Sequence, residues 1–226
     1  INASKLIGMH LTATPNTKLA AILKEKSILK QLKEAGFKVT GANAYSERYF
    51  KLVEDGELAH SASTYAIMAA DIPFRMLDDL EKNNAVFMDI TNDTLISYGV
   101  KIKKYSLKRS AKNLMKIVKN HDFTLYEYFL TDLYGHKRGT IKDIHRVLSH
   151  INKFTEYLIK NANLENEIIV ISSDHGNIED ISHKSHTRNP VPLIIFSKEK
   201  FYLDFLNDRI NSIADVTPAI VELLKE

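Results

Sequence analysis

Short apolar runs alternate along the chain with longer stretches in which apolar residues recur at helical spacing. Helical spacing covers residues 16–36, 61–83, 106–121, 140–161 and 212–226, and Pro73 should interrupt the second of these stretches. The short runs, rich in β-branched residues, predict strands at 37–45, 85–91, 123–132, 166–174 and 190–197. Such alternation is typical of an α/β fold, a mainly parallel sheet with helices on both faces.

The pattern is least regular between residues 45 and 105. We therefore expect a small cap at 45–105, inserted in a core built from residues 1–44 and 106–226. The chain contains no internal repeat and no flexible linker that would mark a further domain.

The amino-acid composition excludes several classes of protein. The 226 residues are 44% hydrophobic and 26% charged, which is ordinary for a globular protein. The net charge of +3 is spread along the chain, so we expect no nucleic-acid partner. Without cysteine, neither disulfides nor thiolate metal sites are possible. No apolar run approaches about 18 residues and no signal peptide is evident, so we expect no membrane partner and a cytoplasmic location.

Polar residues of the metal-ligand type follow two of the predicted strands. Asp132 and His136 follow the first, Asp174 and His175 follow the second, and His186 lies eleven residues beyond His175. Carboxylate oxygen and imidazole nitrogen are ligands for zinc and manganese, and two such clusters could hold two ions. Each piece alone has an ordinary alternative, a helix N-cap for Asp132 and a surface imidazole for His136. Together the five residues predict a binuclear metal site.

The runs DLYGH, SSDHGN and HTRNPVP resemble motifs of the alkaline phosphatase superfamily, especially its cofactor-independent phosphoglycerate mutases and phosphopentomutases. The run DVTPAIVELL resembles the closing helix of the superfamily. The resemblance implies an alkaline phosphatase-like core and two divalent ions, Mn²⁺ or Zn²⁺. It also implies that Asp132, His136 and His186 bind one ion and that Asp174 and His175 bind the other. The implied function is phosphoryl transfer on a small phosphate ester, by a hydrolase or a phosphomutase.

Two features of that family are not found in the 226 residues. One is an early Asp of the second metal site, and the other is the Ser or Thr that becomes phosphorylated. The opening run INASKLIGMHLTATPN resembles the segment that follows this nucleophile. We therefore expect the nucleophile upstream of Ile1, a weaker second metal site and little activity from this chain alone, with Ser4 as a conceivable substitute.

The predicted cap is much smaller than the arginine-rich domain inserted in the mutases, and this size is compatible with a hydrolase. Arg48, Arg75 and His10 are candidates to face the substrate, and solvent-exposed charge is the alternative for each of them. A role of another class is a non-catalytic relative that keeps the fold for structure or interaction. The sequence sets no oligomeric state.

Overall fold

The computed structural model describes residues 17–182 and 185–226, and only the backbone of Lys137 and Arg138. Its described residues divide into two compact units. Unit 1 comprises residues 17–86, 116–127 and 209–226, and unit 2 comprises 87–115 and 128–208. The predicted division into a core and a cap at 45–105 stays a prediction. Across the described ranges, no helix combines the length and the apolar character needed to span a bilayer.

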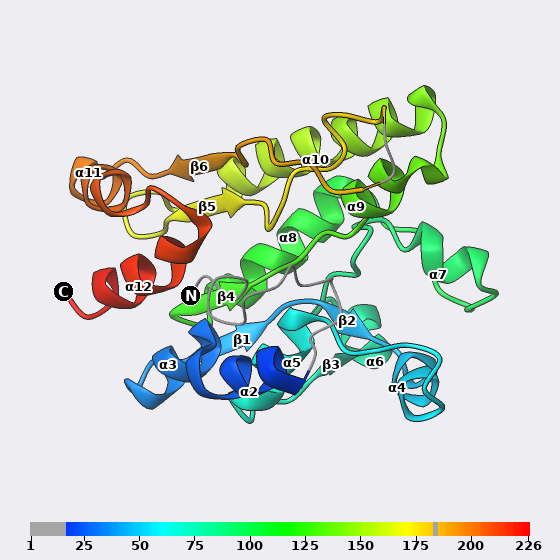
Figure 1. The fold of residues 1–226 in the computed structure, drawn as a ribbon, viewed down its shortest axis with the longest axis horizontal. Helices are drawn as coiled ribbons and strands as arrows, with labels where there is room; N and C mark the ends of the chain where they lie inside the picture. Colours follow the sequence, from blue (N-terminus) through cyan, green and yellow to red (C-terminus); the bar gives the residue numbers. More distant parts are fainter. Residues whose placement is uncertain (1–16, 183–184) are drawn as a thin grey trace. The chain divides into compact units, whose positions relative to one another are not determined.

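Unit 1 combines helices with short parallel strands. Its elements are α2 (Thr17–Lys26), α3 (Ile28–Glu34), β1 (Val39–Gly41), β2 (Ala44–Tyr45), α4 (Glu47–Glu54), α5 (Ala62–Ala69), β3 (Arg75–Met76), α6 (Leu77–Glu81), β4 (Phe123–Leu125) and α12 (Ile213–Leu223). Strand β1 pairs in parallel with β4, and β2 pairs in parallel with β3. Helices α3 and α5 contact β1, and α2 contacts both of these helices (Figure 1).

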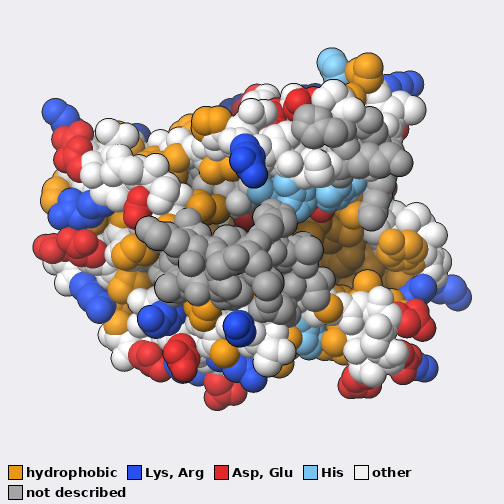
Figure 2. Space-filling view, in the orientation of Figure 1, with side chains coloured by type: hydrophobic (Ala, Val, Ile, Leu, Met, Phe, Trp, Pro, Cys, Tyr) orange, Lys and Arg blue, Asp and Glu red, His pale blue; other side chains and the backbone are white. Residues whose placement is uncertain are grey.

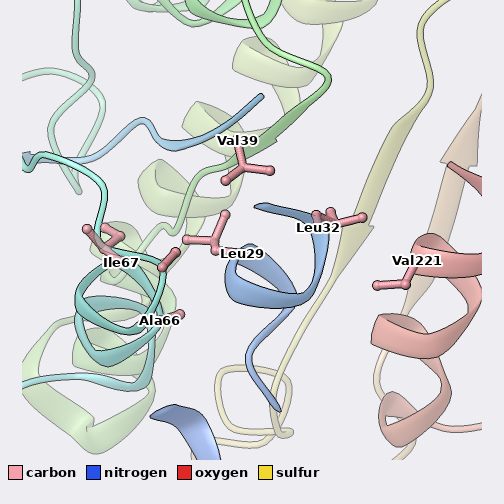
Figure 3. Packing of buried hydrophobic residues seen from close by; sticks show 7 residues of the cluster. Leu29, Leu32, Val39, Ala66, Ile67 and Val221 are labelled. Atoms are coloured by element: carbon pink, nitrogen blue, oxygen red, sulfur yellow. The ribbon is translucent and has the colours of Figure 1, made fainter. Parts of the chain in front are cut away.

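The core of unit 1 forms where α3, α5, β1 and α12 meet (Figure 3). Leu29 and Leu32, one helical turn apart on α3, are completely buried. Truncating a leucine at such a position to alanine costs about 2–5 kcal/mol. Gly41 lets α5 approach closely, because a Cβ there would lie 2.5 Å from Cδ1 of Ile67.

Unit 2 is built mainly from helices. Its elements are α7 (Asp93–Ser97), α9 (Leu130–Leu133), the π-helical turn η1 (Tyr134–Arg138), α10 (Ile141–Asn161), β5 (Ile169–Ser172), β6 (Leu193–Phe196) and α11 (Lys200–Arg209, whose last residue falls in unit 1). Helix α8 (Leu107–Val118) runs from unit 2 into unit 1. Strands β5 and β6 pair antiparallel, with Ile169 opposite Phe196. Helix α10 begins at a capping box in which Thr140 and Asp143 satisfy each other's backbone N–H groups.

The predicted helices are confirmed with local changes. The helix expected at 16–36 is divided at Ser27, whose extended backbone makes it the N-cap of α3. The helix expected at 61–83 ends at Ala69, and a second short helix follows Pro73 as α6. The helices expected at 106–121, 140–161 and 212–226 are α8, α10 and α12.

Two predicted strands are wrong over part of their length. Between residues 85 and 91 only Val86 makes a strand-like bridge, to Asn43. The buried carboxylate of Asp89 then accepts the N–H groups of Asn92 and Thr94, which turns the chain away from an extended path. The strand expected at 123–132 ends at Leu125 as β4. The described strands form three two-stranded sheets, so the continuous parallel sheet stays a prediction.

Candidate metal centre

The first part of the candidate metal centre comes from α9 and η1 of unit 2. Asp132 lies on α9, and His136 follows four residues later on η1. Nε2 of His136 is 3.2 Å from Oδ1 of Asp132. Helical residues four apart share a face, and π-helical turns are frequent at functional sites. The DLYGH segment therefore folds so that its carboxylate and its imidazole meet.

The second part comes from the loop between the antiparallel strands β5 and β6. Asp174 and His175 follow β5, and His186 precedes β6. The N–H of Thr187 donates to the carbonyl of Gly176 over 2.9 Å and closes the loop. This closure is accompanied by stacking of the two imidazoles, whose ring centroids are 3.5 Å apart with the planes 12° from parallel.

Three imidazoles converge on a single carboxylate oxygen, Oδ1 of Asp132. Nε2 of His186 lies 3.4 Å from it and Nε2 of His175 lies 3.8 Å from it, in addition to His136. Asp174 joins the group through His175, with 3.2 Å between its Oδ2 and Nε2 of that ring. The structure therefore brings all five predicted ligands together.

The donor atoms fit a divalent transition metal. One donor atom each from Asp132, His175 and His186 lies within 4.8 Å of the others. Zinc–ligand distances of about 2.0–2.2 Å place two donors of one ion at most about 4.4 Å apart, and the two Nε2–Oδ1 distances involving these histidines are shorter than that. The three side chains are between 20% and 36% exposed, so an ion can reach them from solvent.

This trio contains His175, which the family pattern assigns to the other ion beside Asp174. All three histidines, His136, His175 and His186, lie close to the same oxygen of Asp132, so any of them could share an ion with Asp132. The assignment of each ligand to one of two ions therefore stays a prediction.

The surroundings of His186 favour the neutral imidazole that binds metal. Burial lowers the pKa of His186, and the neighbouring His175 lowers it further. A neutral imidazole offers a lone pair, whereas a protonated one does not. Nδ1 of His175 lies 3.4 Å from the carbonyl oxygen of Gly176, an arrangement that leaves its Nε2 facing Asp132.

Asn177 links the two parts of the centre, and the sequence prediction missed it. Its Nδ2 donates to Oδ1 of Asp132 over 2.8 Å, and the residue is buried. Its carboxamide packs on Gly135, where an added Cβ would lie less than 3.0 Å from it. Gly135 therefore leaves the space through which the SSDHGN segment orients the carboxylate of the DLYGH segment.

Glu179 closes the loop that carries the histidines, and it was also missed. Its Oε2 accepts the N–H of Asn177 over 2.6 Å, and its Oε1 accepts the hydroxyl of Thr187 and, over 3.0 Å, Nδ2 of Asn189. The hydrogen bond from Thr187 is the largest cause of a lowered pKa for Glu179. A Cβ on Gly176 would lie less than 3.0 Å from this carboxylate and from Thr187. Asn177 is the last residue of the SSDHGN motif and Glu179 lies two positions after it, but the role of each depends on tertiary contacts.

The predicted substrate residues receive no support from the site geometry. The guanidinium of Arg75 is used inside unit 1, where it donates to the carbonyls of Gly41 and Asn84 over 3.0 and 2.7 Å and to the hydroxyl of Thr40 over 3.1 Å. Arg48 is exposed on α4. His10 and Ser4 lie outside the described residues. Their roles stay predictions.

Histidine side chains gather on the molecular face drawn in Figure 2. The three imidazoles of the centre are partly exposed, with 20–28% of each side chain accessible. Histidines of this exposure, turned toward a shared carboxylate, are placed to take an ion from solvent.

Comparisons with known proteins agree with this chemistry. A family model described as the metalloenzyme superfamily matches residues 15–225. A 2,3-bisphosphoglycerate-independent phosphoglycerate mutase of Ehrlichia canis (strain Jake) is 31% identical over 139 residues, 58% of this chain and 23% of the relative. One of Pyrococcus abyssi (strain GE5 / Orsay) is 32% identical over 86 residues, 38% of this chain and 20% of the relative. The chain thus spans less than a quarter of either relative.

Among solved structures, the PH0037 protein from Pyrococcus horikoshii aligns with a TM-score of 0.46 and 17% identity, covering 74% of this chain and 39% of that one. The family model covers almost the whole chain and includes every predicted metal ligand. The prediction of family from the DLYGH, SSDHGN and HTRNPVP motifs is therefore confirmed. The chain belongs to the metalloenzyme superfamily, in its alkaline phosphatase-like, phosphoglycerate mutase-related branch.

Proposed function

We propose that the protein catalyses metal-dependent phosphoryl transfer on a small phosphate ester. The observation that carries the proposal is the convergence of His136, His175 and His186 on one oxygen of Asp132. Membership of a metalloenzyme superfamily supports the use of metal, and the names of the two relatives support a phosphate-ester substrate.

Asp132, His136, Asp174, His175 and His186 would hold two divalent ions, Mn²⁺ or Zn²⁺. Such ions neutralise charge on a transferring phosphoryl group and activate the attacking oxygen. The five side chains contain two carboxylates and three imidazoles, which are neutral as ligands. Two negative charges offset only half the charge of two divalent ions. The loaded centre would stay positive and attract a phosphate ester.

Residues around the ligands would fix the centre before an ion binds. Asn177 orients Asp132, and Glu179 ties the segment after His175 to Thr187, the residue after His186, within the loop between β5 and β6. Ligands and charges that need no rearrangement act more strongly during the reaction. On this proposal, the chain holds its ligands in position before the ions bind.

Hydrolysis is our first proposal for the reaction, and phosphomutase activity is the alternative. The small predicted cap at 45–105 is compatible with water as the acceptor. The attacking hydroxyl that the resemblance implies is not matched by a motif in the 226 residues. We therefore expect this chain alone to bind metal and to turn over very slowly, because metals do not replace a positioned nucleophile.

The test compares the full-length protein with the chain that begins at Ile1. Each is assayed on an aryl phosphate and on 3-phosphoglycerate, with Mn²⁺ or Zn²⁺ and with a chelator. Phosphate release by the full-length protein that the chelator stops supports a hydrolase. Isomerisation of 3-phosphoglycerate without release of phosphate supports a mutase. Absence of turnover by the metal-loaded full-length protein would favour a non-catalytic role.

A matched pair of variants ties any activity to the centre. His186→Ala removes one converging imidazole, and His145→Ala removes an exposed imidazole on α10. We expect His186→Ala to lose metal on dialysis and to lose activity, and His145→Ala to keep both. Unchanged metal content in His186→Ala would contradict the proposed site.

A further inference from the structure

A second group of titratable and hydroxyl side chains lies in unit 1, apart from the metal ligands in sequence and in chemistry. Its members come from β2, α4, the start of α5 and the segment after β4: Tyr45, Tyr49, His60, Ser61, Ser63, Thr64 and Glu127. The group contains one carboxylate, one imidazole and five hydroxyls within one hydrogen-bonded network. Its function is not accounted for by the metal centre.

The network contains a continuous series of hydrogen bonds that starts at Glu127. The hydroxyl of Ser63 donates to Oε2 of Glu127. Oγ of Ser63 is 2.9 Å from Oγ of Ser61, which is 3.0 Å from Oγ1 of Thr64. Oγ1 of Thr64 is in turn 3.2 Å from the hydroxyl oxygen of Tyr49.

The series of hydrogen bonds that starts at Glu127 ends at His60. The hydroxyl oxygen of Tyr49 is 3.1 Å from Nδ1 of His60. Five hydrogen bonds in series therefore join the carboxylate of Glu127 to the imidazole of His60.

Counting protons fixes the direction of this chain. An ionised carboxylate can only accept, so the proton of Ser63 points at Glu127. The backbone N–H of Thr64 also donates to Oγ of Ser61, as the N-cap contact of α5. If each contact between two hydroxyls holds a proton as well, every other hydroxyl directs its one proton toward the carboxylate. Ser61 then donates to Ser63, Thr64 to Ser61 and Tyr49 to Thr64. Four hydroxyls satisfy four of the five contacts.

The fifth contact must be satisfied by His60. Because the proton of Tyr49 is already used toward Thr64, Nδ1 of His60 has to carry a proton and donate to the hydroxyl oxygen of Tyr49. The neutral ring then has a bare Nε2. Burial lowers the pKa of His60, which favours this neutral form. Aromatic rings hold the imidazole in place, with Tyr65 edge-on at 5.6 Å between centroids.

The rest of the network agrees with the same direction. Thr64 has two lone pairs, and the hydroxyl of Tyr45, 3.3 Å away, can donate to the one that Tyr49 leaves. Burial raises the pKa of Tyr45 to about 12 and also raises that of Tyr49, so both phenols keep their protons. Asn43 fixes the backbone of Glu127, donating to its carbonyl over 2.7 Å and accepting its N–H over 2.9 Å.

We propose that His60 is the ligand-facing group of a second site, where its Nε2 accepts a hydrogen bond from a hydroxyl of a small polar ligand. Glu127, Ser63, Ser61, Thr64 and Tyr49 are positioning residues that fix the tautomer of His60. A metal is the poorer occupant, because His60 is the one imidazole of the group and its one carboxylate, Glu127, is separated from it by five hydrogen bonds. An anion is disfavoured as well, because Nε2 presents a lone pair rather than a proton.

Nitrogen NMR of the imidazole groups tests the assignment directly, because the two ring nitrogens resonate far apart when only one carries a proton. We expect His60 of the wild-type chain to be in the Nδ1–H form, and Glu127→Ala or Ser63→Ala to lose this preference, because each variant removes one link of the series. Tyr45→Phe, which removes a side branch of the network, should keep it. An Nε2–H form in the wild type, or a tautomer unchanged in both chain-breaking variants that remain folded, would reduce the network to a helix cap and overturn the proposal.

Diethyl pyrocarbonate tests whether the bare nitrogen can be reached, since it acylates an unprotonated imidazole nitrogen. Peptide mapping compares His60 with the exposed His145 in the same sample. We expect His60 to react in the wild type and several-fold more slowly in Glu127→Ala, where the preference for a bare Nε2 is lost. Glycerol, as a simple polyol, should slow the reaction of His60 more than that of His145. An unreactive His60, or equal slowing of the two histidines, would overturn the hydroxyl-binding role.

Discussion

The two histidine-containing clusters use the same chemical groups in opposite ways. In unit 2, three imidazoles converge on one oxygen of Asp132, which concentrates lone pairs where an ion could bind. In unit 1, one carboxylate, Glu127, acts through a series of hydroxyls on a single imidazole, His60. The connectivity of the hydrogen bonds thus distinguishes a group of carboxylate and histidines suited to a metal from one suited to a hydrogen-bonded ligand.

The largest effect should come from removing the carboxylate on which the imidazoles converge. Asp132→Asn keeps the shape but loses the charge, so we expect metal affinity to fall by at least about 100-fold. Asp174→Asn is the comparison, because that side chain is 73% exposed and contacts the cluster through His175 alone among the described ligands. Calorimetric titration with Zn²⁺ measures both. A larger loss in Asp174→Asn would place the principal ion away from Asp132.

Gly135→Ala should be the next largest, because its Cβ would displace the carboxamide of Asn177 and break the bond to Asp132. We expect a loss of about 1–3 kcal/mol in the free energy of unfolding, together with weaker metal binding. Asn177→Ala and the double variant complete a cycle. If the clash is the cause, the variant that carries both Gly135→Ala and Asn177→Ala should lose less free energy of unfolding than the two single losses added together. A loss equal to their sum would contradict the clash.

Glu179→Gln should weaken metal binding by about 10-fold, the lower end of the range for residues that orient ligands. Glu179 accepts three hydrogen bonds, and an amide would turn one donor toward another. Glu165→Gln is the control, since Glu165 forms an exposed ion pair with Lys198. Equal metal affinity in Glu179→Gln and the wild type would show that the loop holds its histidines without this carboxylate.

The smallest predicted effect is on the pH dependence of the free energy of unfolding, to which His60 should contribute. Burial holds the pKa of His60 in the folded chain below the ordinary imidazole value of 6.5, so below pH 6.5 the unfolded chain takes up this proton first. His60 therefore favours folding above pH 6.5, and that contribution falls as the pH drops toward the folded pKa. His60→Gln should flatten this part of the stability curve in metal-free protein, whereas His145→Gln should not. A steeper curve in His60→Gln would give the wrong sign.

Much of the candidate metal centre could be proposed from sequence because its candidate ligands stand in short motifs. Asp132 and His136 are four residues apart, and Asp174, His175 and His186 lie within one loop. Asn177 was not predicted, because its role depends on Gly135, which is 42 positions earlier in the chain. The candidate ligands were therefore easier to recognise from sequence than Asn177, the buried residue that orients one of them.

The fold was predicted well where helices carry their own signals and less well at strand ends. Helix α10 has a capping box and an apolar face, both visible in the sequence. Strand β4 ends earlier than predicted, at Leu125, and soon afterwards the side chain of Asn43 takes both backbone groups of Glu127. A contact between residues 84 positions apart leaves no local pattern. For the same reason the chain from Glu127 to His60 was not predicted.

Anomalous diffraction from crystals grown with Zn²⁺ or Mn²⁺ shows directly whether Asp132, His175 and His186 meet at a metal ion. We expect a metal peak at bonding distance from Oδ1 of Asp132 and Nε2 of His186. A second, weaker peak beside Asp174 would support two ions. Metal-loaded crystals with no peak at Asp132, or with their peaks only elsewhere on the protein, would contradict the proposed centre.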